Sequence, residues 1–359
     1  MNHHRLLILA LAFGVALLPA CAALKKQPAT PTPPTNAAPA PIAPAPLPPM
    51  TGQVSVEQFI ATMVTKHGFQ RAALVELFAK VQPRERIIQI MTAPAEGKPW
   101  NKYRPIFVND ARIEGGVQFW RDNAPALAHA ERQYGVPAEI IVAIIGVETR
   151  YGGNMGSFPV IDALATLAFD YPPRADYFRS ELEQFLLLTR EEHLDPLAPK
   201  GSYAGAMGEA QFMPSSYRQY SVDFDGDGKR DLWQSTSDAI GSVANYLSGY
   251  GWQREQPIAT LARVYGNDYQ ATLDQKLTKP QRTIAQFKDA GVVAETCLEN
   301  QRLAMLVRLE LDQGQEFWLG LDNFYVITRY NHSARYAMAV YQLSQEILVR
   351  HQHLTNGAK

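Results

Sequence analysis

In the stretch Ile140-Ile-Val-Ala-Ile-Ile-Gly-Val-Glu148, an apolar run ends in a carboxylate. Gly135-Val-Pro-Ala-Glu139 precedes it and places a proline just inside a helix start and an acid in the first turn, where the helix dipole favours negative charge. The pair Gly152-Gly153 predicts the end of the helix. Glu148 therefore lies in the last turns of a predicted helix.

Two features of this position disfavour the ionised form of Glu148. Its carboxylate faces the negative end of the helix dipole, and it adjoins a strongly apolar run. We therefore expect a raised pKa, and a carboxyl that is still protonated near neutral pH can protonate a leaving glycosidic oxygen. The alternative is a solvated acid paired with a neighbour such as Arg150.

Composition limits the class of protein. The chain has 359 residues, of which 46% are hydrophobic and 19% charged, which is enough for a globular body of two or three subdomains with a core. Its formal net charge is -1, so no broad cationic field exists to bind nucleic acid. A neutral, polar substrate fits this charge balance better.

The N-terminus has the pattern of a secretory signal. Arg5 precedes an apolar run from Leu6 to Leu18 that is too short for a comfortable membrane span, so residues 1–20 are assigned to a signal peptide. Its end, Leu18-Pro-Ala-Cys21, resembles the bacterial lipobox, in which the cysteine is lipidated and becomes the mature N-terminus. Ala22, in place of an aspartate that would favour inner-membrane retention, points to the periplasmic face of the outer membrane. An ordinary signal peptide cut nearby is the alternative.

A tether and an unpaired cysteine follow from the composition. Residues 27–50 are almost entirely Pro, Ala and Thr, a composition that cannot bury a core and rises by about 3.1 Å per residue where it is polyproline-like. Residues 21–52 are therefore assigned to a tether, with an idle spacer as the alternative.

If Cys21 carries lipid, Cys297 has no partner and no intramolecular disulfide is expected. Cys297 is then most simply a buried small apolar residue.

The apolar pattern changes along the chain. Between residues 54 and 134, apolar side chains recur at steps of three and four, and residues 136–250 again indicate helices, broken by loops rich in glycine and proline. One more helix, residues 333–351, closes the chain. After residue 257, short runs rich in β-formers are separated by turn residues. The predicted strands are 304–311, 317–321 and 323–329.

These patterns predict a mainly α (α+β) protein in three folded parts. A helical domain covers 53–134 and is completed by 329–359. A helical core at 135–257 carries nearly all of the unusual residue clusters. A small β-subdomain follows at 258–328.

Several motifs share one resemblance. Ile145-Gly-Val-Glu-Thr-Arg-Tyr-Gly152 resembles the Glu-containing segment of lysozyme-like lytic transglycosylases. Ala204-Gly-Ala-Met-Gly208 and Gln211-Phe-Met-Pro-Ser-Ser-Tyr217 resemble the second motif of these enzymes. Together with Val222-Asp-Phe-Asp-Gly-Asp-Gly228 and Arg329-Tyr-Asn-His-Ser-Ala-Arg-Tyr-Ala-Met338, they make the chain similar to the membrane-bound lytic transglycosylase B family.

The resemblance covers residues 55–350 and implies a lysozyme-like helical core with an EF-hand-like loop, a helical supporting domain and a small β-subdomain. It implies cleavage of the β-1,4 bond between N-acetylmuramic acid and N-acetylglucosamine in peptidoglycan, in which the C6 hydroxyl of the muramic residue attacks C1 and gives a 1,6-anhydro product. A two-carboxylate glycosidase would need a partner acid. Asp162 is more simply a helix N-terminal residue and Asp170 the polar end before two prolines. Glu148 is therefore expected to act alone, first as acid and then as base.

A glycan groove needs aromatic platforms together with amide and hydroxyl groups, because sugars present flat CH faces and many hydroxyls. The resemblance assigns such roles by position in the motifs, with an arginine as the contact for a muropeptide carboxylate. For each tyrosine, core packing with a satisfied hydroxyl is the alternative. The implied substrate-binding residues are Ser202, Gln211, Phe212, Tyr246, Tyr330, Tyr336 and Arg174.

The segment from Asp223 to Asp231 follows the EF-hand loop rule, with acidic residues at positions 1, 3, 5 and 9 and glycine at position 6. Oxygen ligands so spaced suit a hard cation, so a structural Ca²⁺ is expected. Position 12 is Gln234 in place of the usual glutamate, and Asp238 is expected to close the site. A solvated Asp-Gly turn is the alternative. The predicted ligands are Asp223, Asp225, Asp227, Asp238 and the carbonyl of Lys229.

Two other functions stay open on the sequence alone. A goose-type lysozyme-like hydrolase would use water and leave a reducing sugar. A catalytically idle peptidoglycan-binding lipoprotein would use the acidic loop as a calcium sensor. The expected partners are glycan strands and the membrane, which the protein reaches through the N-terminal lipid. The sequence does not reveal whether it has protein partners.

Overall fold

The computed structural model describes residues 47, 49–92, 98–274 and 276–356. The chain divides into two units, at residues 1–45 and 46–359, and the helices and strands of the fold belong to the second. The predicted signal peptide, Cys21 and most of the predicted tether lie outside the described residues. Within the described ranges, no helix has the length and apolar character that a membrane crossing requires.

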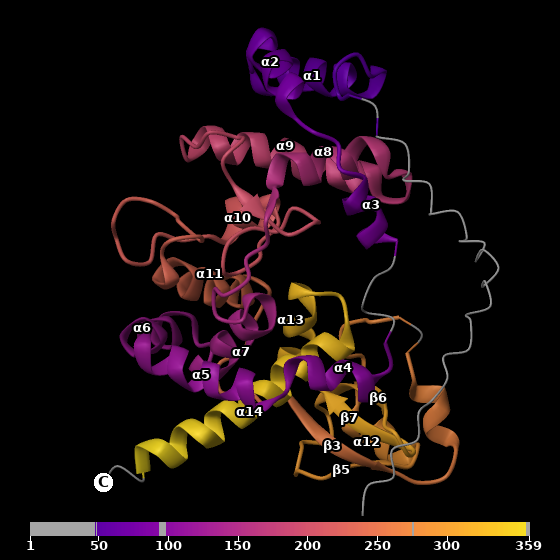
Figure 1. Cartoon of the computed structure of the whole chain (residues 1–359). Coiled ribbons are helices and arrows are strands. Elements are labelled where there is room, and N and C mark those ends of the chain that lie inside the picture. Colours follow the sequence, from indigo (N-terminus) through magenta and orange to yellow (C-terminus); the bar gives the residue numbers. More distant parts are fainter. Residues whose placement is uncertain (1–46, 48, 93–97, 275, 357–359) are drawn as a thin grey trace, which may run out of the picture. The chain divides into compact units, whose positions relative to one another are not determined.

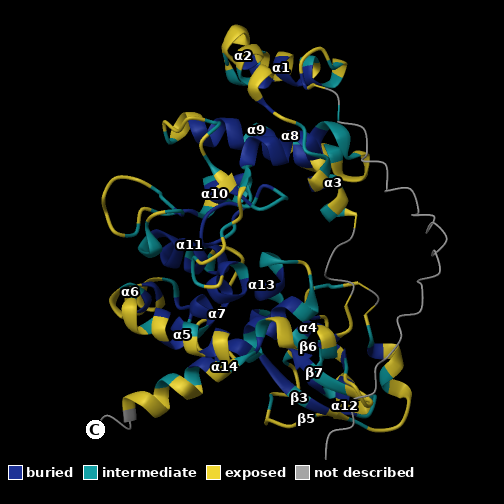
Figure 2. Cartoon of the chain, viewed as in Figure 1, coloured by how far each residue is buried: buried dark blue, intermediate teal, exposed yellow. Residues whose placement is uncertain are grey.

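Helix α7 (Ala138–Thr149) lies at the centre of the main hydrophobic core. Ile140, Ile141, Ile144 and Ile145 are fully buried, so the helix is covered on every side, as expected for a helix that is apolar all round. Each buried isoleucine stabilises the fold by roughly 1.5–3 kcal/mol relative to an exposed one. The dark blue of α7 and its neighbours in Figure 2 shows this buried centre.

The remaining helices pack around α7 or extend its core. Figure 1 shows α14 running beside α5 and α7, and α8 lying beside α9. The same core continues from Met50 to Ile347, so the supporting helices and the central ones are not separated by a solvent layer. The helices are α1 (Val54–His67), α2 (Arg71–Lys80), α3 (Glu85–Met91), α4 (Trp100–Phe107), α5 (Asp110–Asp122), α6 (Ala124–Tyr134), α8 (Val160–Asp170), η2 (Pro172–Arg174), α9 (Ala175–Glu191), α10 (Pro214–Tyr220), α11 (Thr236–Gly249), η3 (Asp268–Thr272), α12 (Ile284–Asp289), α13 (Asp322–Tyr330) and α14 (Ala334–Asn356).

A small antiparallel sheet forms between residues 259 and 320 and has the order β4-β6-β7-β3-β5. A second core cluster lies against it, where Ile284 and Phe287 of α12 pack with sheet residues. A separate pair, β1 and β2, joins the segments on either side of α8 and α9. The strands are β1 (Phe158–Pro159), β2 (Lys200–Gly201), β3 (Ala259–Val264), β4 (Arg282–Thr283), β5 (Val292–Ala294), β6 (Leu303–Glu310) and β7 (Gln315–Gly320).

Two expectations about the C-terminal part were wrong. The predicted strand at residues 323–329 is helix α13. Its β-forming residues misled the prediction, whereas the buried Phe324 and Ile327 stand three positions apart, which is a helical spacing. Cys297 is exposed, because it lies in the loop between β5 and β6, where the backbone runs over the surface.

The fold class is as predicted: mainly helical, with a small antiparallel β-subdomain. The last helix extends to Asn356, beyond the expected end at residue 351. The finer boundaries at 53–134, 135–257 and 258–328 stay predictions, because residues 46–359 form a single compact unit.

Candidate active site

Helix α7 ends at Thr149, earlier than the glycine pair suggested. Arg150 and Tyr151 both adopt left-handed backbone conformations, with φ of 55° and 60°, which non-glycine residues seldom do. The Tyr151 hydroxyl donates to the Arg112 carbonyl at 2.6 Å. A Cβ at Gly146 would lie 2.5 Å from the Tyr151 hydroxyl oxygen, which explains the glycine inside the apolar run.

Glu148 is half-buried at this helix end. The Tyr336 hydroxyl, on α14, donates to Glu148 Oε1 at 2.5 Å. Burial, with the charge of Glu148 as a further cause, raises the pKa of Tyr336 well above its usual range, and the pKa of Tyr330 likewise. Tyr336 therefore stays protonated and is a permanent hydrogen-bond donor to the carboxylate. The expected rise in the pKa of Glu148 itself stays a prediction.

Aromatic residues from three separate segments meet beside this pair. The rings of Tyr330 and Tyr336 are nearly parallel with centroids 6.5 Å apart, and Tyr246 lies 4.8 Å from Tyr330. Phe212 lies 5.4 Å from Tyr246 and 5.8 Å from Tyr330. The Tyr330 hydroxyl donates to the Ala210 carbonyl at 2.6 Å. These predicted residues thus form one aromatic wall, in which Phe212, Tyr246 and Tyr336 are almost fully buried and pack in the core, and only Tyr330 is partly exposed.

Gln211 and Ser202 brace the loops of the second motif. Gln211 has a left-handed φ of 50°, and its amide nitrogen donates to the Gly208 carbonyl at 2.9 Å and to the Met155 carbonyl at 3.2 Å. The Ser202 hydroxyl oxygen accepts from the backbone nitrogens of two residues of its own loop, at 3.2 and 3.1 Å. Their contacts with a sugar stay predictions.

Arg174 contacts two aromatic rings at the start of α9. It is exposed, and its guanidinium lies over the rings of Tyr177, at 4.5 Å, and Phe178, at 5.1 Å. Burial lowers the pKa of His332, and the positive charges of Arg329 and Arg174 lower it further. The predicted contact of Arg174 with a muropeptide carboxylate stays a prediction.

Sequence reasoning missed Arg112. This buried arginine of α5 donates to the Gly146 carbonyl, and its Nη1 lies 3.4 Å from the Val147 carbonyl. Burial lowers the pKa of Arg112, whereas the nearby charge of Glu148 acts in the opposite direction. A cation at the C-terminal end of α7 offsets the helix dipole that was expected to act on Glu148. No local pattern predicts it, because Arg112 is distant in sequence.

The acidic loop brings together oxygen atoms suited to a cation. One carboxylate oxygen from each of Asp223, Asp225 and Asp227 lies within 4.8 Å of the others, and all three residues are exposed. Asp238 is fully buried, and its oxygens accept at 2.8 Å from the backbone nitrogens of Phe224 and Asp231. Asp238 thus organises the loop, and its role as a ligand stays a prediction.

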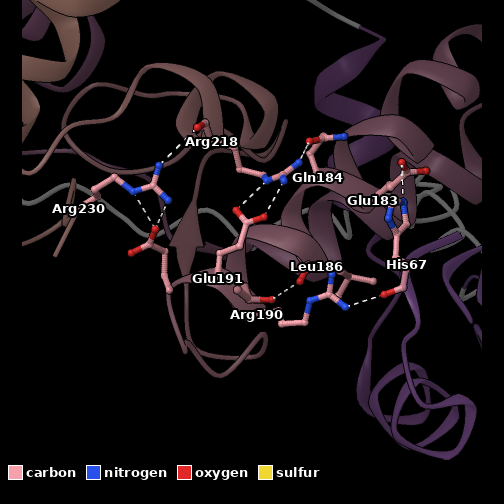
Figure 3. Close-up of polar contacts among 10 residues, drawn as sticks. His67, Glu183, Gln184, Leu186, Arg190, Glu191, Arg218 and Arg230 are labelled. Carbon is pink, nitrogen blue, oxygen red and sulfur yellow. Dashed lines mark hydrogen bonds and ion pairs between the residues drawn. The ribbon is translucent and has the colours of Figure 1, made fainter.

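Ion pairs tie this loop and α10 to the end of α9. Arg230, which follows the acidic residues, pairs with Glu192, and Arg218 of α10 pairs with Glu191 at 2.6 Å. Figure 3 shows these contacts in a row along α9, with the contact between His67 and Glu183 at the other end. The loop is therefore held at its base while its carboxylates face solvent.

The chain is similar over most of its length to known proteins. Residues 52–345 match the family model described as Transglycosylase SLT domain. The chain belongs to this transglycosylase family. It is 47% identical over 303 residues to membrane-bound lytic murein transglycosylase B of Escherichia coli (strain K12), a match that covers 82% of each chain.

Two solved structures extend the comparison within the transglycosylase family. The Escherichia coli lytic transglycosylase Slt35 in complex with calcium has a TM-score of 0.77 and 45% identity, over 84% of this chain and 95% of that one. SltB3 from Pseudomonas aeruginosa in complex with NAG-anhNAM-pentapeptide has a TM-score of 0.72 and 32% identity, over 82% of this chain and 80% of that one. The protein is thus an enzyme, a lytic murein transglycosylase of the B type.

Proposed function

We propose that Glu148 is the single acid/base with which this transglycosylase cleaves the β-1,4 bond between N-acetylmuramic acid and N-acetylglucosamine. The contact between Tyr336 and Glu148 carries the proposal. A carboxyl group beside an aromatic wall, with one oxygen held by a permanently protonated hydroxyl, is an oriented group for proton transfer. The Pseudomonas SltB3 structure contains an anhydro-muramyl ligand, which is the product class that this reaction forms.

The proposed reaction balances without water. Glu148 gives its proton to the glycosidic oxygen as the bond from that oxygen to C1 of the muramic residue breaks, with the substrate acetamido group assisting. The carboxylate then takes the proton of the C6 hydroxyl, whose oxygen forms the new bond to C1. Glu148 ends protonated again, and the products together have the mass of the substrate.

Of the two acids that the sequence offered as a second carboxylate, Asp162 is already paired, whereas Asp170 lies at the C-terminal end of α8. Asp162 is buried in the first turn of α8, where it pairs with Arg84 at 2.7 Å and accepts from the backbone nitrogen of Gln82 at 3.0 Å. Asp170 is the last residue of α8, and its Oδ2 has no hydrogen-bond partner among the described residues. The ion pair of Asp162 thus argues against Asp162 as a second carboxylate.

Replacing Glu148 with Gln tests the assignment. We expect E148Q to lose activity on purified peptidoglycan by about a thousandfold or more, because proton transfer is removed from both steps. Mass spectrometry of the wild-type product separates the reaction from hydrolysis, since a hydrolase product is heavier by one water. Undiminished release of muropeptides by E148Q would overturn the assignment and leave the chain as a binding protein at this site.

We also propose that the acidic loop holds a structural Ca²⁺ through Asp223, Asp225, Asp227, the Lys229 carbonyl and Asp238. Three converging carboxylates match the preference of Ca²⁺ for hard oxygen ligands. Slt35 of Escherichia coli has been solved in complex with calcium. The cation would screen the mutual repulsion of the three aspartates and hold the loop in one conformation.

For the location, we propose lipidation of Cys21 and anchoring at the periplasmic face of the outer membrane. The Escherichia coli relative is named as membrane-bound. Because the described residues include no helix suited to span a membrane, a lipid at the end of the Pro/Ala-rich tether is the simplest link to a bilayer. Peptidoglycan glycan strands are the proposed substrate partner.

A further inference from the structure

We propose that Glu209 is a positioning residue, which holds the C-terminal turn of α7 against the segment from Leu232 to Thr236 and so sets where the Glu148 carboxyl stands. The inference rests on the proposed role of Glu148. Glu209 belongs to the second motif but received no role in the sequence reasoning. It is only 9% exposed, and Glu209 Oε2 has no hydrogen-bond partner among the described residues.

The turn after Glu148 requires outside support. Three consecutive residues, Arg150, Tyr151 and Gly152, have positive φ, and such conformations persist only where surrounding contacts fix them. Thr149 supplies part of this support, because its buried hydroxyl oxygen accepts from the Gly152 nitrogen at 3.0 Å. The proton of the same hydroxyl is shared between the Glu209 carbonyl, at 3.0 Å, and the Ile145 carbonyl of α7, at 3.2 Å.

Glu209 meets this turn through its side chain as well. A Cβ added to Gly152 would lie 3.0 Å from Glu209 Oε1, so the carboxyl packs directly on the Gly152 backbone. On its other side, Glu209 Oε1 accepts from the Thr236 hydroxyl at 2.9 Å, and the Glu209 nitrogen donates to the Leu232 carbonyl at 2.7 Å. Glu209 is thus fixed by the segment that leads into α11 and bears on the turn beside Glu148.

The choice of a carboxyl at this place is costly for stability. Burial raises the pKa of Glu209, and the hydrogen bond from Thr236 offsets only part of that effect. An apolar side chain of equal length would fill the space without leaving a buried oxygen unpaired. A buried carboxyl oxygen without a partner is expected where function selects the residue. The adjacent turn follows closely after Glu148, the proposed acid/base.

Two variants of similar volume separate the polar role from packing. E209Q keeps an acceptor for Thr236, whereas E209M fills the space without one. We expect kcat of E209M to fall about tenfold with KM within about twofold, because a displaced acid affects the chemical step more than sugar binding. E209Q should retain kcat within about twofold of the wild type. T236V, which removes the donor, should resemble E209M, and the double variant should be no worse than either single one.

Glu181 provides the matched control, since it is also a buried glutamate, but its carboxyl accepts from Ser215 at the start of α10. E181M should lower the melting temperature without changing kcat. If E209M kept the wild-type kcat while E148Q abolished activity, the positioning role would be wrong and the function of Glu148 would stand. If E148Q were fully active, the proposed function itself would fail. Equal losses of kcat in E209M and E181M would also overturn the inference, because a general packing effect would then explain both.

Discussion

At the residue scale, the proposed orientation of Glu148 rests on the hydroxyl of Tyr336, which donates to its carboxylate. A hydrogen bond to a charged group contributes roughly 1.5–3 kcal/mol, and each 1.4 kcal/mol corresponds to about a factor of ten in rate. We therefore expect Y336F to lower kcat by about ten- to a hundredfold, measured on purified peptidoglycan. Y217F is the control, because the buried Tyr217 donates its hydroxyl proton to the Arg230 carbonyl instead. A Y336F enzyme with wild-type kcat would show that Glu148 needs no such donor.

Glu209 leads to a prediction about stability and pH. Because burial raises the pKa of Glu209 in the folded state, the unfolded chain releases this proton first, and stability falls as pH rises above the unfolded pKa of about 4.3. Glutamine has no proton to release. E209Q should therefore melt above the wild type at pH 7, and the difference should shrink as pH falls toward 4 in thermal unfolding followed by circular dichroism. A difference that is constant with pH would mean that Glu209 has the same pKa in both states.

Site residues could be predicted from the sequence where they belong to a local motif. Glu148, Tyr330 and Tyr336 came from motifs, and the structure brings them together. Arg112 and the proposed side-chain role of Glu209 did not, because Arg112 donates to the Gly146 carbonyl and Glu209 accepts from the Thr236 hydroxyl, and both partners are distant in sequence. Such contacts exist only after the helices have packed, so no local residue pattern marks them.

At the scale of single elements, the acidic loop should respond to calcium. Added Ca²⁺ should raise the melting temperature of the wild type, since a ligand that binds only the folded state stabilises it by mass action. The rise should disappear in D223N, which loses one of the converging carboxylates, and persist in D289N, an exposed aspartate of α12. Chelation should lower the wild-type melting temperature while cold activity is retained. If calcium left the wild-type melting temperature unchanged, the loop would be a solvated turn.

Elements with a single dominant signal were predicted, and elements with conflicting signals were not. The helix at α7 has apolar residues throughout and clear start signals, so its type and start were predicted; its end was not, because Arg150 and Tyr151 take conformations usually left to glycine. Residues 323–329 carry β-forming side chains in a helical spacing. In that segment tertiary packing favours the helix. The side chain of Asn323 makes hydrogen bonds of 2.8 Å with the backbone of Gln253.

At the scale of the whole molecule, the N-terminal anchor can be tested by cell fractionation. C21S should move the enzyme from the membrane fraction to the soluble periplasmic fraction, because the lipid is the proposed link to the bilayer. C297S serves as the control, since Cys297 is a free, exposed cysteine in the loop before β6. Retention of C21S in the membrane fraction would point to another mode of attachment.

The main fold was predictable as a class, since periodicity and motifs indicate the helical and β-rich parts of the chain. The packing of these parts around one shared core was not predictable. The core that unites residues from Met50 to Ile347 depends on which helix faces meet, and the sequence carries that information only through packing that no single segment shows. The predicted domain boundaries therefore divide the chain more sharply than its continuous core does.

The position of Tyr336 in the last helix has a consequence for biogenesis. The hydroxyl that orients Glu148 lies 188 residues further along the chain, on α14, which packs beside α5 and α7. If the chain is exported N-terminus first, as proposed, a polypeptide still crossing the inner membrane exports Glu148 before Tyr336. On this proposal the contact between Tyr336 and Glu148 forms only after nearly the entire chain has crossed, so a partly exported chain would lack the oriented carboxyl that the proposed reaction requires.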